Sequence, residues 1–328
     1  MKINCRLYTP SDIGKLVALW NENAEWGLID EEQWKNVFYH TPFGASTIVL
    51  ATSKDDPDDI LAQFVFIPTR ISVKGIEVKA FKPCAPIVKK NARDEMGLAT
   101  LFTFILKMYK YATTHFINEG IYLLHIMPDV RWVRGFQMIP GIQVAHFPLW
   151  CLPLDKDIPQ HLPDGYSIED ISPSDSRIDK LWARSAKLHD CGIVRDTSFF
   201  PWKLSHRNYR FVAITSNSRL VGFAVFIYKD VIKGIIICDV LAEDEEALAL
   251  TIQLACSGAS SFRRSLPEKE QANCEKVSIL ATPPIQKIVS GMGFEKNKYK
   301  FSLAVHVLGK GLSKKDVNPE RWYVSAND

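Results

Sequence analysis

The sequence lacks several features that would indicate a secreted, membrane-spanning or metal-binding protein. Its seven cysteines lie far apart, are odd in number and include no C-x-x-C pair, so we expect neither a disulfide framework nor a metal site. Residues 1–8 alternate in polarity instead of forming an apolar export signal, and Lys107 and Lys110 interrupt the longest apolar helix. We therefore expect reduced thiols, no membrane span and a cytoplasmic location.

A large excess of one charge is also missing. The 40 Lys and Arg residues against 37 Asp and Glu residues give a net charge of +3, too small to predict binding to nucleic acid or to an anionic membrane. With 47% apolar and 23% charged residues, the composition is that of a soluble globular protein. A chain of 328 residues is too long for one ordinary core, so two domains are expected; the oligomeric state is not predicted.

What the sequence does contain is one pattern that occurs twice. Residues 9–12 (TPSD) and 172–175 (SPSD) resemble capping boxes with proline at the first helical position, which are typical of helix starts. These segments are 163 residues apart, and the same separation relates the strand-like runs 48–53 and 211–216. A register kept over about forty residues predicts an internal duplication.

Both copies are expected to contain the same elements in the same order. After a hairpin come a strand, a long helix, a second strand, a short helix started by proline and a Gly-Phe pair. These are 80–88, 97–118, 121–126, Pro128 and Gly135-Phe136 in the first copy, and 232–241, 244–264, 276–280, Pro283 and Gly293-Phe294 in the second. Prolines punctuate the polar segment 154–165, which we interpret as a linker between domains 1–153 and 166–328. The charged tail after Gly309 is expected to wrap the surface.

The turn at Gly97 is the strongest candidate for a ligand site. The free N–H groups and positive dipole end of a helix start favour an anion such as phosphate, and small residues at 97 and 99 would let it approach the backbone. The alternative is that Gly97 simply starts a helix. Four carboxylates, residues 243–246, occupy the equivalent position of the second copy, where we expect no bound anion.

This order of elements resembles the GNAT family of acyl-CoA N-acyltransferases, and the duplication resembles bacterial proteins with two fused GNAT domains. The resemblance implies an α/β (α+β) fold of two tandem GNAT-like domains, each a mixed, mostly antiparallel sheet flanked by helices. The family's phosphate turn, Gln/Arg-x-x-Gly-x-Gly/Ala, matches residues 94–99, with Asp94 at the basic position. The implied coenzyme A contacts are Arg93, Asp94, Glu95, Met96, Gly97, Leu98 and Ala99, together with backbone pairing of the pantetheine around Ala85, Ile87 and Val88.

The resemblance also implies a reaction. An acetyl or other acyl group would move from coenzyme A to the amine of a small molecule or an amino sugar, without a metal. Family members usually protonate the leaving thiolate with a tyrosine shortly before the Gly-Phe pair, where this sequence has Arg131 and Trp132. Candidate bases are Glu77, His125 and Asp129, although each has a simpler interpretation as an exposed charge, a core histidine or a helix cap.

Aromatic and acidic residues near the first two helices are candidates for acceptor binding. Trp20, Glu25 and Trp26 can hold an amine by stacking, cation–π contact and hydrogen bonding, unless the tryptophans are core residues. Two other functions stay open. The missing tyrosine fits an inactive GNAT-like ligand-binding or assembly module, and a Fem-type aminoacyl transferase doubles the same fold but takes a charged tRNA, against which the mild net charge argues.

Overall fold

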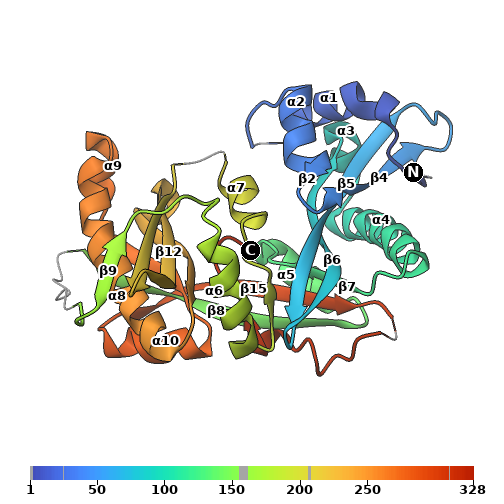
Figure 1. Ribbon diagram of the computed structural model, residues 1–328. Coiled ribbons are helices and arrows are strands. Elements are labelled where there is room, and N and C mark those ends of the chain that lie inside the picture. The colour runs from blue at the N-terminus through green and yellow to red at the C-terminus, as the bar shows by residue number, and fades with distance from the viewer. Residues whose placement is uncertain (1–2, 25, 155–161, 206–207, 310) are drawn as a thin grey trace.

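The computed structural model describes residues 3–24, 26–154, 162–205, 208–309 and 311–328 (Figure 1). The first half contains β1 (Ile3–Leu7), α1 (Ile13–Asn23), α2 (Glu31–Trp34), β2 (His40–Thr41), β3 (Gly44–Ala45), β4 (Thr47–Ser53), β5 (Ile60–Val73), β6 (Ile76–Val88), α3 (Lys90–Asp94), α4 (Leu98–Asn118), β7 (Leu123–Ile126), α5 (Val130–Gln137) and β8 (Ile142–Pro153). The second half contains β9 (Tyr166–Glu169), α6 (Arg177–Ser185), β10 (Cys191–Ile193), α7 (Phe199–Leu204), β11 (Arg210–Ser216), β12 (Arg219–Lys229), β13 (Gly234–Ala242), α8 (Glu245–Ser265), α9 (Glu268–Asn273), β14 (Lys276–Leu280), α10 (Pro283–Gly291), β15 (Glu295–Val307) and β16 (Trp322–Tyr323).

The duplication expected from the sequence is visible in the order of these elements. The strands β4 and β11 are both seven residues long and keep the separation of 163 residues. The long helices α4 and α8 are both 21 residues long and follow equivalent strands, β6 and β13. The two halves therefore share one architecture in spite of their different sequences.

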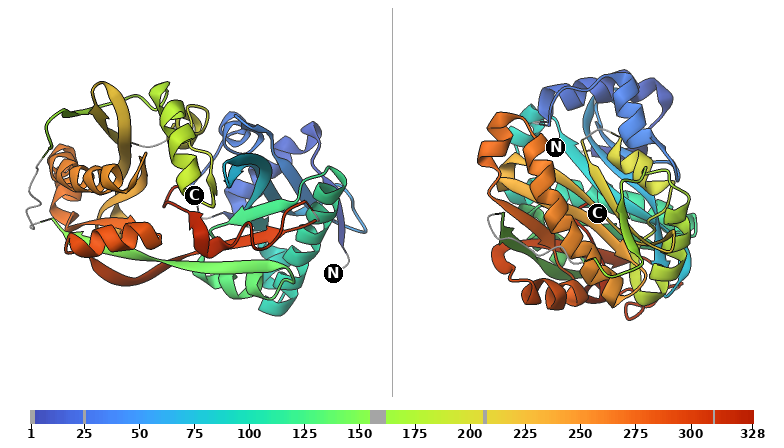
Figure 2. Two further views of the ribbon diagram at one scale, coloured as in Figure 1. Left: turned by 60° about the horizontal axis from the view of Figure 1, so that its bottom comes forward. Right: turned by 60° about the vertical axis from the view of Figure 1, so that its left-hand side comes forward.

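The strands β8 and β15 each cross to the other half, so that both halves belong to one 14-stranded sheet. The strand β8 pairs antiparallel with β14 of the second half, while β15 pairs antiparallel with β7 of the first half. The two crossing strands also pair with each other, and Figure 2 shows them running side by side between the halves. The halves are thus joined by β8 and β15 in addition to the predicted linker, of which residues 155–161 lie outside the described part.

Aromatic packing fixes α4 on one face of the sheet, as the period of its apolar residues predicts. Phe116 of α4 is fully buried, stacks on Phe81 at a centroid distance of 4.4 Å and meets the edge of Phe66 at 5.4 Å. Val65 and Ile67 alternate with these residues along β5 and pack instead with α1 and α2 on the opposite face. The sheet of the first half is therefore covered by helices on both sides.

The tail after Gly309 lies on the surface only in its first part, where residues 313–315 are exposed, and the prediction is wrong for its last part. Trp322, Tyr323 and Val324 are buried, and β16 pairs in parallel with β10. The mostly apolar stretch 322–326 follows a charged segment. The composition averaged over the whole tail is polar, so it did not indicate that this stretch is buried. The burial of this stretch brings the last described residues of the chain to the centre of the molecule, between the two halves (Figure 1).

Other sequence-based expectations concern membranes, metals and thiols. None of the helices within the described residues is long and apolar enough to cross a bilayer, and the same residues contain no cluster of three potential metal ligands. All seven cysteines are free. Burial raises the pKa of Cys84 and of Cys191 to about 12, so both thiols are protonated and unreactive at neutral pH.

The capping box before α1 is tied to the neighbouring strand. Asp12 accepts a hydrogen bond from the backbone N–H of Thr9 at 2.8 Å, and the two terminal nitrogens of Arg6 each donate to one Asp12 oxygen at 2.7 Å. Bonding to Arg6, aided by Thr9, lowers the pKa of the almost buried Asp12 carboxyl to about 2. The ionised carboxylate therefore stabilises the folded state.

We expect Asp12→Asn to lower the free energy of unfolding by about 2 kcal/mol at pH 7, since one pKa unit corresponds to about 1.4 kcal/mol. Because the pKa is depressed in the folded state, this contribution is complete above the unfolded value of about 4 and is lost as the pH falls toward 2. Urea unfolding at pH 7 and pH 3 measures it. Asp58→Asn, which removes an exposed partner of Lys15, is the control, and an equal loss at pH 7 would contradict the prediction.

Candidate functional site

A bulge interrupts the pairing of β5 and β6. Two residues of β6, Ala85 and Pro86, lie opposite Phe64 alone, because the register shifts at this point. Pro86 has no N–H and cannot continue the ladder. Ala85 has a φ of +47°, a left-handed conformation that costs a residue with a Cβ about 1 kcal/mol or more. Strained residues of this kind cluster at functional sites, so the bulge is a natural place to look for one.

The end of β6 beyond this region is open on one side. The parallel strands β6 and β7 pair at Phe81 and Leu124, whereas β6 continues to Val88 with no further β7 residue paired to it within the described part of the chain. Backbone groups of residues 85–88 that point toward β7 are therefore left for another partner. An extended amide chain such as pantetheine can add to a strand edge of this type. At the point where β6 and β7 diverge, side chains that include Pro83 and His125 fill the space, and no cavity large enough for a water molecule remains.

The helix α4 begins shortly after this open strand, and its first turn is uncapped. Gly97 is the N-cap residue in an extended conformation, and no side chain caps the helix start. A Cβ at Gly97 would meet no atom within 4 Å, so there is room beside the first N–H groups. Residues 93–95 are exposed just before the turn, Met96 is half-buried and Ala99 is exposed in the first helical turn. The side chain of Leu98 lies outside the described part. The arrangement suits a phosphate group.

The structure does not bring the three candidate bases together. Glu77 lies at the hairpin end of β6, about 26 Å along the strand from Ala85, and one oxygen is 3.3 Å from Arg70 Nη1. Asp129 is the N-cap of α5, half-exposed, with its carboxylate 2.9 Å from Arg131 Nε. Both positions agree with the simpler interpretations, an exposed charge and a helix cap.

His125 is the candidate base that lies at the divergence of β6 and β7. It is 1% exposed, and its Nε2 is 2.8 Å from Thr69 Oγ1. Burial, together with the positive charges of Lys82, Arg195 and Lys203, lowers the pKa of His125 to about 3. The imidazole is therefore neutral at pH 7 and is a weaker base than a histidine in water.

A pocket of about 620 Å³, which we call the central pocket, lies between the two halves. Its lining includes Trp20, Trp26, Lys203, Lys229, Val231 and Asn327. Trp20 belongs to the same hydrophobic cluster as Cys84 and Ala85, so the pocket and the bulge of β6 border one cluster. The lining comes from both halves, so the pocket is complete only when they are joined.

The two tryptophans proposed for acceptor binding both line the central pocket. Trp20 is 7% exposed and donates from Nε1 to the carbonyl oxygen of Gly27 at 2.8 Å. Trp26 is 64% exposed, with its ring centroid 5.4 Å from that of Trp20. Trp20 therefore serves as a fixed wall, and Trp26 lies at the solvent side. Glu25 lies outside the described residues.

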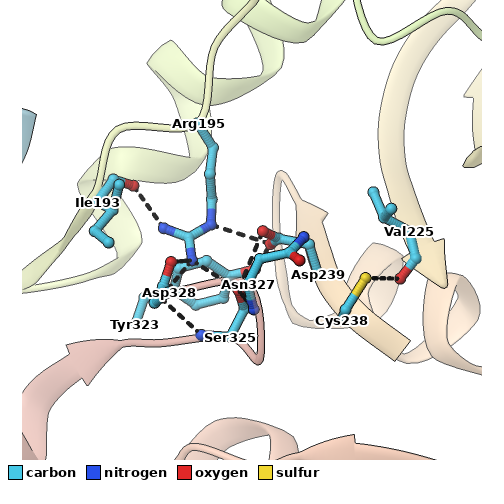
Figure 3. Close-up of polar contacts among 9 residues, drawn as sticks. All are labelled: Ile193, Arg195, Val225, Cys238, Asp239, Tyr323, Ser325, Asn327 and Asp328. Carbon is cyan, nitrogen blue, oxygen red and sulfur yellow. Dashed lines mark hydrogen bonds and ion pairs between the residues drawn. The ribbon is translucent and has the colours of Figure 1, made fainter. Parts of the chain in front are cut away.

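Figure 3 shows a buried ion cluster whose residues Asp239 and Asp328 directly follow Cys238 and Asn327, two residues that line the central pocket. Arg195 is held between Asp239, at 3.0 Å, and Asp328, at 2.7 Å, and all three side chains are almost completely buried. The guanidinium also lies over the ring of Tyr323, 4.5 Å from its centroid. Burial raises the pKa of Asp239, against the opposing charge of Arg195. Lys82 of β6 donates to the backbone oxygen of Asp328, so the cluster also links the first half to the chain's last segment.

The equivalent helix start in the second half is closed by its own side chains. Asp244 caps α8 and accepts a hydrogen bond from the Ala247 N–H at 2.8 Å. Glu245 pairs with Lys287 at 3.0 Å beside a cavity of about 380 Å³. An N–H that a phosphate would need is therefore already bonded to a carboxylate, so this helix start is less suited to an anion than the start of α4.

No pattern in the sequence predicts the part of the central pocket that the second half supplies. Lys203, Lys229 and Asn327 are remote from Trp20 in the sequence, and no spacing relates them. The buried tail and the crossing strands bring them together, and neither was expected. One signal was present: the run 199–203 (FFPWK) ends its aromatic residues with a lysine.

Comparisons with known proteins identify the fold. The sequence matches no protein-family model and no curated protein. The structure resembles a GCN5-related N-acetyltransferase from Anabaena variabilis (TM-score 0.68, 12% identity, 94% of this chain and 73% of that chain). It also resembles a tandem GNAT protein from the clavulanic acid biosynthesis pathway (0.57, 13%, 95% and 100%) and N-myristoyltransferase of Saccharomyces cerevisiae with bound myristoyl-CoA (0.57, 10%, 94% and 79%).

Identities this low establish the fold and no more. The chain has the tandem GNAT fold, with mostly antiparallel sheets flanked by helices, and the fold class expected from the sequence is confirmed.

Proposed function

We propose that this chain, which has the tandem GNAT fold, transfers an acyl group from coenzyme A to the amine of a small molecule. The observation that carries the proposal is the uncapped start of α4 at Gly97, nine residues along the chain from the end of β6, whose edge is open and bulges at Ala85. An uncapped helix start and a free strand edge in this order suit the two parts of coenzyme A, its pyrophosphate and its pantetheine. Acetyl-CoA and longer acyl-CoA molecules remain equal candidates for the donor.

Each part of the site has a proposed role. The N–H groups of the first turn of α4 bind the pyrophosphate, and backbone groups of Ala85, Ile87 and Val88 pair with the pantetheine. The thioester then lies near the bulge, and the amine approaches from the central pocket. The uncharged amine attacks the thioester carbonyl carbon and the carbon–sulfur bond breaks. The proton that the amine loses ends, by way of water, on the departing sulfur, which leaves as the free thiol of coenzyme A. Holding the two reactants in this geometry supplies much of the rate.

Among the candidate bases, His125 is the one that lines the divergence of β6 and β7. Its low pKa suits a hydrogen-bond partner better than a full proton acceptor at pH 7. We propose that the second half binds no coenzyme A and serves as the facing wall of the acceptor pocket. The free thiols fit a cytoplasmic location for this reaction.

Calorimetric titration with acetyl-CoA and with coenzyme A tests the proposal. We expect binding of both with one site per chain, and release of free thiol from acetyl-CoA when the correct amine is added. Absence of heat and of any rise in melting temperature at millimolar ligand would overturn the proposal. Binding without thiol release across a broad panel of amines and amino sugars would favour the inactive ligand-binding module instead.

A further inference from the structure

We propose that the cavity of about 380 Å³ at the start of α8, which we call the second-half cavity, binds a small uncharged amide with an apolar body. The proposed acyl transfer assigns no ligand to this place. The inference does not depend on that transfer, because the lining comes from the second half, for which we propose no coenzyme A.

The second-half cavity lies where the parallel strands β13 and β14 separate. The two strands pair over residues 234–237 and 276–279, and β13 then continues to Ala242. Val240 and Ala242 line the cavity together with residues at the starts of α8 and of α10, the helix that follows β14. Side chains fill the equivalent divergence of β6 and β7 in the first half, so the two halves differ in where they leave room for a ligand.

The edge of β13 offers backbone groups to such a ligand. The Glu243 N–H donates to the carbonyl oxygen of Val221 in β12 at 3.0 Å, so every second residue before Glu243 also pairs with β12. The residues between them turn their N–H and C=O groups toward the gap left by β14. Ser185 already donates to the carbonyl oxygen of Ala242 at 2.7 Å. Val240 therefore presents one donor and one acceptor, the pair of groups that an amide matches.

Thr282 provides a second, independent observation. This residue is 3% exposed and lines the cavity. It occupies the N-cap position of α10, yet its side chain does not cap the helix, and its hydroxyl has no hydrogen-bond partner in the part of the chain that the structure describes. A buried hydroxyl without a partner costs free energy, which a ligand with a matching polar group would recover.

The imidazole of His189 adds another uncharged polar group. Its ring stacks on that of Tyr323 at a centroid distance of 4.5 Å, and both residues line the cavity. Burial, together with the charge of Arg195, lowers the pKa of His189 to about 4, so the ring is neutral at pH 7. A neutral imidazole carries one N–H donor and one acceptor nitrogen. The polar groups inside the cavity thus both donate and accept without charge, which suits an amide better than an ion.

The charged residues of the lining are exposed. Glu245 and Lys287 pair at 3.0 Å and are 64% and 79% exposed, while Asp244 is an exposed helix cap. Two carboxylates against one ammonium group leave a net negative charge at the mouth of the cavity. A ligand with a phosphate or carboxylate would therefore be repelled.

Apolar side chains form much of the wall and favour an apolar ligand body. Leu248 of α8 and Ile285 of α10 are buried, and Leu188 is 55% exposed at the rim. The volume of about 380 Å³ lies within the usual range for small-molecule sites.

A matched pair of ligands tests the inference on the intact protein. N-acetyl-L-phenylalaninamide is uncharged with an aromatic body, and N-acetyl-L-phenylalanine has the same shape with a carboxylate in place of the terminal amide. In ligand-observed NMR titrations we expect the amide to bind at one site per chain and the acid to bind at least about ten-fold more weakly. Thr282→Val, which keeps the shape and removes the hydroxyl, should weaken amide binding about five-fold.

A variant that fills the cavity has a matched control in the first half. Leu248 lies four residues after the N-cap of α8, and Leu101 lies four residues after the N-cap of α4. Leu248→Phe should weaken amide binding at least about ten-fold by occupying the space, whereas Leu101→Phe should leave it unchanged. Melting temperatures of all variants check their folding.

Three results would overturn the inference: no amide binding to the unmodified protein at about 10 mM ligand, equal binding of the amide and the acid, or unchanged amide binding in Thr282→Val or Leu248→Phe. Acetyl-CoA titration of the same preparations separates the two proposals. Amide binding without acetyl-CoA binding would refute the proposed function alone. Displacement of the amide by acetyl-CoA, with weaker acetyl-CoA binding in Leu248→Phe, would place coenzyme A in the second half and overturn this inference.

Discussion

Replacing Gly97 with aspartate is expected to weaken coenzyme A binding at least 100-fold, about 2.8 kcal/mol, while the fold stays intact. The backbone of Gly97 is extended, and a Cβ there meets no atom within 4 Å, so the new side chain fits without strain. Aspartate is a preferred N-cap residue and would accept a hydrogen bond from the first turn of α4. The carboxylate would therefore stabilise the helix slightly and would occupy the anion site with a like charge.

Two matched variants make this result specific. Gly97→Asn has nearly the same shape and caps the helix without charge, so it should reduce binding much less than aspartate. Glu245→Gln changes the equivalent helix of the second half and should leave the affinity for coenzyme A unchanged. Calorimetry measures all three. Equal effects of Gly97→Asp and Glu245→Gln would show that the ligand site has been placed in the wrong half.

The second large effect concerns stability. Arg195→Leu is expected to lower the free energy of unfolding by about 4 kcal/mol, because it leaves Asp239 and Asp328 as buried carboxylates without their shared partner. Removing one member of a buried ion cluster is more damaging than removing the whole cluster. Urea unfolding at pH 7 measures the loss, and the double variant Arg195→Leu, Asp239→Asn should recover part of it.

The control for this effect is a surface ion pair. Lys287 and Glu245 are both largely exposed, at 79% and 64%, so Lys287→Leu should change stability by less than about 0.5 kcal/mol. A loss of less than 1 kcal/mol for Arg195→Leu would mean that water reaches the cluster, against its burial in the structure. The difference in the free energy of unfolding between the variant and the unmodified protein should also become smaller on mild acidification. Protonation then removes the unpaired negative charge of the buried carboxylates.

Local patterns in the sequence were sufficient for the order of the elements. A capping box marks the start of α1, and periodic apolar residues mark the strands β4 and β11 and the long helices α4 and α8. The repetition of these patterns in both halves strengthened each assignment. The turn at Gly97 was also predicted residue by residue, because a glycine before an amphipathic helix is a local signal. The bulge was not predicted, since alanine is not a residue that suggests a left-handed φ at Ala85.

The contacts between the halves could not be read from local patterns. The strands β8 and β15 have similar lengths, 12 and 13 residues, and no local pattern assigns either of them to a partner strand in the other half. Which strand pairs with β7 is decided by the packing of the whole molecule. The central pocket depends on that exchange and on the buried tail, so Lys203, Lys229 and Asn327 had no local feature that marked them as neighbours of Trp20.

The exchange of β8 and β15 also bears on how such a chain can evolve. A gene fragment encoding residues 1–153 would produce β8 without β14 and β7 without β15, and would expose unpaired strand edges that invite aggregation. A fragment encoding residues 166–328 would likewise contain β14 without β8 and β15 without β7. Fission into two independent genes would thus be selected against even if the second copy had lost all chemistry of its own. Because each half needs a strand of the other, the second copy cannot be lost without damage to the first. Its surface residues can still change.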